Sequence, residues 1–271
     1  MRILVKVGGA PLLEPASRAA FAEAVAAARR AGHELLVVHG GGEQVRAWSK
    51  RLGIQDRYVN GLRVTDAQTA EVVLAVLGGE VNRQVVAALG AAGAPAVGLT
   101  GADGNAYDAR RLTSEGADLG YVGEVAGVRP GLALGLLAQG FVPVMASLAP
   151  LAEDAVGSRD RLYNINADHA AAPLAAAFAV DALLFLTDVP GVLDAAGELV
   201  ARLTPGLRAE LAAAGVFAGG MRPKVDAAVS GARACPRAVV KIAPAGGAGC
   251  VLEALLPEVG THVIALESSD G

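Results

Sequence analysis

Short apolar runs alternate along the chain with longer segments in which apolar residues recur every three or four positions. The short runs are typical of buried strands, which we predict at residues 3–7, 34–39, 94–99, 142–146, 182–187 and 238–242. The longer segments predict helices at residues 17–31, 43–52, 67–77, 81–91, 131–138, 168–177, 205–213 and 220–232. This alternation indicates an α/β fold, a three-layer αβα sandwich around a mainly parallel sheet.

Some stretches depart from this alternation. Residues 105–128 hold several glycines and short valine-containing pieces, which suit β-hairpins better than helices. The loop 148–162 is irregular, and the tail 267–271 is expected to be frayed. Because no repeat or linker divides the chain, we expect two closely packed lobes of one domain.

Composition and net charge exclude several kinds of protein. The chain has 271 residues, of which 53% are hydrophobic, so it can bury a sizeable core. Its net charge is −4 and it has no block of lysines and arginines, which argues against nucleic-acid binding. Its 2 cysteines and 4 histidines lack disulfide or metal-ligand spacing. We therefore expect a reduced, cytoplasmic setting and no metal site formed by the protein.

The apolar stretch 170–186 could be mistaken for a membrane span. Pro173 and Asp181 interrupt it, and it is shorter than the roughly 20 apolar residues that a span needs. We expect a buried helix followed by a buried strand, and no association with a membrane.

Two glycine clusters follow the first two predicted strands. Lys6 precedes Gly8 and Gly9, and His39 precedes the run 40–42 of three glycines. Glycines let backbone N–H groups approach an anion closely, and a lysine adds a positive charge. If the two strands are neighbours in the sheet, both clusters face one crevice and could hold one phosphoryl group. The alternative for each cluster alone is an ordinary turn.

Three further runs carry polar residues that local structure does not require. In the run 60–66, Thr65 or Asp66 could cap the helix that follows. Arg63 could clamp a carboxylate, or it could be a surface arginine paired with a nearby acid. The run 164–168 has two asparagines and Asp168 at a helix start, more than capping needs. In the run 219–224, Lys224 opposes the helix dipole, which favours a role in a site.

Taken in order, these motifs resemble the amino-acid kinase family. The matching runs cover residues 38–42, 60–66, 81–82, 98–104, 119–125, 164–168, 186–192 and 219–224. The run 60–66 is similar to the segment with which some members bind N-acetylglutamate. The resemblance implies an N-terminal lobe, 1–165, for acyl-amino-acid binding and dimerisation. A C-terminal lobe, 166–271, would bind ATP.

The resemblance also implies residue roles. Lys6 and Lys224 would stabilise charge on the transferring phosphoryl group, Asp168 would orient both lysines, and Gly9 and Gly41 would donate backbone hydrogen bonds to that group. The acyl amino acid would contact Arg63, Asn164 and the backbone of Gly41 and Gly42. The residues implied for the nucleotide are Thr187, Asp188, Val189, Gly191, Val192 and Phe217.

The implied reaction transfers a phosphoryl group from ATP to the γ-carboxylate of N-acetyl-L-glutamate, the second step of arginine biosynthesis. A carboxylate is already an ionised nucleophile, so no general base is needed, and Mg²⁺ would arrive on the ATP phosphates. One alternative is a kinase for aminoadipate or glutamate linked to an acidic carrier protein, which would need a basic docking surface. Another is a non-catalytic amino-acid sensor, which would not need two lysines and an aspartate together.

Two features bear on regulation and on the nucleotide site. Arginine-inhibited family members carry an extension before the first strand, whereas Lys6 lies near the start here. We therefore expect a homodimer without arginine feedback. The family usually has a His-Ile-Ile-Asp-Gly-Arg-like stretch where this chain has residues 239–245. The rim of the nucleotide pocket is expected to differ there.

Overall fold

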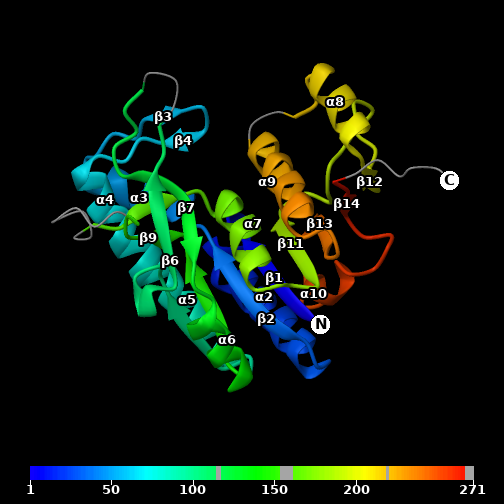
Figure 1. The fold of residues 1–271 in the computed structure, drawn as a ribbon, viewed down its shortest axis with the longest axis horizontal. Helices are drawn as coiled ribbons and strands as arrows, with labels where there is room; N and C mark the ends of the chain where they lie inside the picture. Colours follow the sequence, from blue (N-terminus) through cyan, green and yellow to red (C-terminus); the bar gives the residue numbers. More distant parts are fainter. Residues whose placement is uncertain (114–116, 153–160, 218–219, 266–271) are drawn as a thin grey trace.

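A mainly parallel sheet forms the centre of the molecule, in the computed structural model that describes all residues except 114–116, 153–160, 218–219 and 266–271 (Figure 1). For Ala10 it describes the backbone alone. The strand order is β12-β14-β13-β11-β1-β2-β8-β5, and only β13 and β14 pair antiparallel. These strands are β1 (Arg2–Val7), β2 (Glu34–His39), β5 (Ala96–Leu99), β8 (Val142–Ala146), β11 (Ala182–Thr187), β12 (Arg202–Leu203), β13 (Val239–Pro244) and β14 (Thr261–Val263). The predicted strands and fold class are confirmed.

Helices cover both faces of this sheet, because successive strand side chains point to opposite sides. Leu4 and Phe185 pack into one core and Val5 and Leu184 into the other. The first core lies under α6 (Gly131–Ala138), α7 (Ala167–Ala177), α8 (Pro205–Ala213) and α9 (Met221–Ala234). The second lies under α1 (Ala10–Leu13), α2 (Pro15–Arg30), α3 (Gly42–Arg51), α5 (Asn82–Ala91) and α10 (Cys250–Glu253). This is the expected three-layer arrangement.

Two smaller sheets accompany the central sheet in the described part of the chain. The hairpins predicted in residues 105–128 are present as the antiparallel pair β6 (Tyr107–Arg111) and β7 (Val122–Val128), after the short helix η2 (Asp103–Asn105). This pair continues into β10 (Tyr163–Ile165) and β9 (Leu148–Ala149). A separate hairpin pairs β3 (Tyr58–Val59) with β4 (Leu62–Arg63). Asn60 and Gly61 form its turn with φ of 49° and 79°, as two-residue hairpins require.

The prediction of separate helices at residues 67–77 and 81–91 is wrong. A continuous helical run passes through α4 (Ala67–Val73), the π-helical segment η1 (Leu74–Val81) and α5. Gly78 and Gly79 do not interrupt it, because wider π-turns keep the backbone bonded and Leu77 and Val81 are buried in the core. In the described part of the chain, this run alone has the length and hydropathy of a membrane span, and 44% of its most apolar window is buried. A core helix has the same properties.

The apolar stretch 170–186 forms a helix and a strand, α7 and β11, as expected, and both lie in the core. The irregular loop 148–162 begins with β9. Most of the rest of that loop, and the tail 267–271, lie outside the described residues.

Candidate active site

Both glycine clusters border one cavity at the carboxyl edge of the central sheet. Strands β1 and β2 pair directly, with Lys6 opposite Val38 and Val7 opposite His39, so the segments that follow them emerge side by side. The expectation that these strands are neighbours is confirmed. The cavity, about 260 Å³, brings together most of the predicted catalytic and substrate residues. These are Lys6, Gly9, Gly41, Gly42, Arg63, Asn164 and Asp168.

Asp168 joins two lysines that are far apart in the sequence. Lys6 Nζ lies 2.8 Å and Lys224 Nζ 3.3 Å from the same oxygen, Asp168 Oδ1. On β1, Lys6 is two residues after Leu4 and so points to the same sheet face, which α7 and α9 cover. Asp168 lies in the first turn of α7, and Lys224 lies in the first turn of α9. The packing of these helices on one face therefore assembles the cluster.

The cluster is largely buried from solvent, because the side chains of Lys6, Asp168 and Lys224 are 7%, 14% and 11% exposed. Burial alone would raise the pKa of the Asp168 carboxyl, but the two ammonium groups outweigh burial and hold this pKa below its ordinary value. Burial and the positive charge of Lys6 lower the pKa of Lys224, although Asp168 opposes them. Two cations around one anion leave a net positive charge that suits an incoming phosphoryl group.

The first glycine segment brings backbone close to Lys6. Gly9 has a φ of 66°, which favours glycine, and a Cβ at Gly8 would lie 3.3 Å from Lys6 Nζ. A Cβ at Gly41 would lie 2.6 Å from Leu77 Cδ2, so the helical run from α4 to α5 packs directly on this loop. Gly41 precedes the first turn of α3, whose N–H groups therefore point toward the cavity.

His39 anchors the glycine loop from behind, a role that sequence reasoning missed. Its Nδ1 lies 2.9 Å from the Gly40 carbonyl oxygen, and its Nε2 lies 2.9 Å from Asn82 Nδ2. Complete burial, assisted by the charge of Arg83, lowers the pKa of His39 to about 4 despite the bond to Gly40. The neutral ring thus donates from Nδ1 to Gly40 and accepts from Asn82. The pairing of Asn82 with a histidine 43 positions earlier in the chain had no local signal.

Caps account for some of the polar residues, as expected. Asn166 accepts hydrogen bonds from the N–H groups of Asp168 and His169 and so caps α7. Asp66 caps α4 by accepting from Thr69 N at 2.8 Å. Asn164 has no part in capping. It lies on β10, donates to a threonine hydroxyl and lines the cavity.

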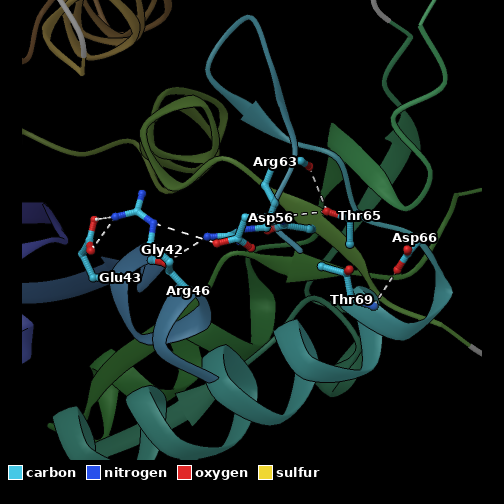
Figure 2. Close-up of polar contacts among 9 residues, drawn as sticks. Gly42, Glu43, Arg46, Asp56, Arg63, Thr65, Asp66 and Thr69 are labelled. Carbon is cyan, nitrogen blue, oxygen red and sulfur yellow. Dashed lines mark hydrogen bonds and ion pairs between the residues drawn. The ribbon is translucent and has the colours of Figure 1, made fainter. Parts of the chain in front are cut away.

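Arg63 is buried, with 7% of its side chain exposed, and borders the cavity. It is also paired with an acid, Asp56, so the paired arginine considered from the sequence is present at a buried position, and the clamp on a carboxylate stays a prediction (Figure 2). Its second terminal nitrogen donates to the Gly42 carbonyl oxygen at 3.1 Å, and its guanidinium lies 4.9 Å from the Tyr58 ring centre. Sequence reasoning missed Asp56 and Tyr58, although the Asn-Gly turn and strand register could have placed them beside Arg63.

The residues predicted for the nucleotide lie elsewhere, beyond β1. Thr187 ends β11 and, with Asp188, lines a second cavity of about 480 Å³ beside residues 244–247. The side chain of Val192 is fully buried in the core, and Phe217 packs against that core. Val189 and Gly191 belong to the same turn after β11. Gly219 of the lysine motif lies outside the described residues.

Comparison with known proteins identifies the family of this chain. The family model described as "Amino acid kinase family" matches residues 1–241. An acetylglutamate kinase of Koribacter versatilis is 47% identical over 227 residues, 84% of each chain. That of Solibacter usitatus is 43% identical over 265 residues, 97% of this chain and 99% of the relative.

Solved structures support the fold. The Streptococcus mutans protein smu.665 superposes with a TM-score of 0.80 at 26% identity, over 98% of this chain and 99% of that one. A carbamate kinase of Giardia lamblia superposes with a TM-score of 0.67 at 17% identity, over 97% of this chain and 98% of that one, and shows the fold alone. The family model and the relatives together establish that this chain belongs to the amino acid kinase family.

Proposed function

We propose that the chain is a phosphotransferase with acetylglutamate kinase activity, converting ATP and N-acetyl-L-glutamate to ADP and N-acetyl-L-glutamyl 5-phosphate. The observation that carries the proposal is the Lys6–Asp168–Lys224 cluster, which borders, through Lys6 and Asp168, the same cavity as two glycine segments and Arg63. The curated relatives named acetylglutamate kinase, at 43–47% identity, support this substrate. A binding protein would not need two buried lysines around one carboxylate.

In this mechanism, Arg63 and Asn164 hold the α-carboxylate end of the acyl amino acid. The γ-carboxylate oxygen then attacks the γ-phosphorus of ATP while the bond to the bridging oxygen breaks, and ADP leaves with that electron pair. Lys6, Lys224 and the N–H groups of Gly9 and Gly41 stabilise the charge on the transferring group, which is the main requirement of phosphoryl transfer. The nucleophile is ionised beforehand, so no side chain must accept a proton.

We assign ATP to the C-terminal lobe, 166–271, and the acyl amino acid to the N-terminal lobe, 1–165. Family membership implies ATP as phosphoryl donor. Mg²⁺ enters as part of the Mg·ATP substrate, since both lysines already engage the Asp168 carboxylate. The nucleotide roles of Thr187, Asp188, Val189, Gly191, Val192 and Phe217 are part of this proposal, with Val192 contributing through its backbone because its side chain is buried. A homodimer and a cytoplasmic location complete it.

A hydroxamate assay with Mg·ATP tests the proposal by comparing N-acetylglutamate, free glutamate, N-acetylaspartate and 2-aminoadipate. Turnover selective for N-acetylglutamate is expected. A folded protein that binds ATP but is inactive with all four would favour a carrier-linked substrate. Absence of both turnover and ATP binding would favour a non-catalytic sensor.

A further inference from the structure

Asp56 links two arginines from different elements at the cavity. Its Oδ1 pairs with Arg63 of β4, and its Oδ2 lies 3.9 Å from Nε of Arg46 on α3 (Figure 2). Arg46 is also held by Glu43, whose two carboxylate oxygens lie 2.6 and 2.7 Å from Arg46 Nη1. The Tyr58 ring lies near both guanidinium groups, 4.9 Å from that of Arg63 and 6.0 Å from that of Arg46.

The two arginines line the cavity, whereas Asp56 is not among its lining residues. Asp56 therefore holds Arg63 from behind and does not occupy the place of a ligand. It is only 19% exposed and Arg63 only 7%, so their interaction is weakly screened by solvent. With one terminal nitrogen on Asp56 and the other on the Gly42 carbonyl, the Arg63 guanidinium has one fixed orientation.

We propose that Asp56 is a positioning residue that determines the preference for a free α-carboxylate. It acts through Arg63: by fixing the guanidinium between the hairpin and the glycine loop, it presents the remaining N–H donors of Arg63 to the cavity in advance of binding. A preorganised, charge-assisted clamp discriminates strongly against a neutral group in place of the carboxylate. This inference rests on the proposed function.

The experiment that tests this proposal measures KM of Asp56→Asn and of the wild type for N-acetylglutamate and for its α-carboxamide. Asparagine keeps the shape and a hydrogen-bond acceptor but loses the charge. We expect KM for N-acetylglutamate to rise roughly tenfold, the difference between a charged and a neutral hydrogen bond. KM for ATP should stay nearly constant, and the preference for the free acid over the carboxamide should shrink by a similar factor.

The matched control is Glu34→Gln, which neutralises a carboxylate paired with Arg2 at 2.9 Å at the start of β2, far from the cavity. It should leave both KM values unchanged. Asp56→Glu should recover part of the preference, which separates positioning from simple destabilisation. In an Arg63→Ala background, Asp56→Asn should cause no further rise in KM.

Several results would overturn the proposal. These are an unchanged preference in Asp56→Asn, equal rises in KM for ATP and for the amino acid, or an undiminished effect of Asp56→Asn without Arg63. A wild-type protein that ignores N-acetylglutamate would instead overturn the proposed function. Should Asp56→Asn fold poorly, as judged by its melting temperature, Asp56→Ser is measured on the same two substrates, and a wild-type preference in that uncharged variant would contradict a positioning role.

Discussion

Replacement of Asp168 by asparagine removes the charge that holds the two lysines together. Lys6 Nζ and Lys224 Nζ lie 2.8 and 3.3 Å from one Asp168 oxygen, and the three side chains are 7–14% exposed. Removing one partner from such a buried ion cluster lowers the free energy of unfolding by about 3–5 kcal/mol. Asparagine still accepts a hydrogen bond, which offsets about 1 kcal/mol of this loss. We expect a loss of about 3 kcal/mol in the free energy of unfolding, or roughly 6–12 °C in Tm.

The same change alters the pH dependence. In the wild type, the pKa of Asp168 is lowered, so its stabilising contribution is present above the ordinary carboxyl pKa and is lost as the pH falls through the folded value. The pKa of Lys224 is lowered mainly by burial, and Asp168 opposes this. Without Asp168, the pKa of Lys224 falls further, so its ammonium form is lost at a lower pH. The alkaline limb of the kcat profile should move toward neutral pH.

The assay measures Tm at pH 7 and kcat by hydroxamate formation between about pH 6 and 10, where kcat at neutral pH should fall roughly 100-fold. Asp118→Asn is the matched control, since it removes the charge of an aspartate paired at 2.7 Å with Arg111, and the side chains of this aspartate and arginine are 76% and 53% exposed. That control should leave Tm and kcat almost unchanged. A wild-type Tm and alkaline limb in Asp168→Asn would refute the electrostatic role given to this carboxylate.

Lys224→Ala should lower kcat roughly 100-fold with less change in either KM, because charge stabilisation in the transition state is lost, and normal turnover would exclude that role. Arg63→Ala should act mainly by raising KM for N-acetylglutamate roughly tenfold or more, as steady-state kinetics will show. Chelation of Mg²⁺ by excess EDTA should abolish turnover but preserve calorimetric binding of N-acetylglutamate; metal-independent turnover would contradict the use of Mg·ATP. Gly41→Ala would place a Cβ 2.6 Å from Leu77 Cδ2 and should cost about 1–3 kcal/mol of stability, whereas Gly90→Ala on α5 has nothing within 4 Å and should be neutral or stabilising.

Local patterns in the sequence were sufficient for most of the elements and for the cluster at the sheet edge. Strand and helix periods identified the central strands, and the side-chain caps at Asp66 and Asn166 were visible as polar residues before apolar runs. The polar residues left over after capping, Asn164 and Asp168, do line the cavity. These features depend on neighbours within a few residues, which the sequence displays directly.

The helix that passes through Gly78 and Gly79 shows where local reasoning failed. Two glycines predict a break, because each lowers helix stability. Burial of Leu77 and Val81 in the core outweighs that cost, and the packing of Leu77 on Gly41 makes this helix part of the site. Only the assembled core decides such a balance.

The sequence alone determined the fold class, the family resemblance and the residue types needed for phosphoryl transfer. The tertiary structure alone decided which side chains share a charge environment. The two lysines meet at Asp168 because α7 and α9 pack on one sheet face, and Asp56 reaches Arg63 because a hairpin folds over the glycine loop. Electrostatic and hydrogen-bond interactions act over a few ångströms in space, and distance along the chain does not reveal which groups come within that range.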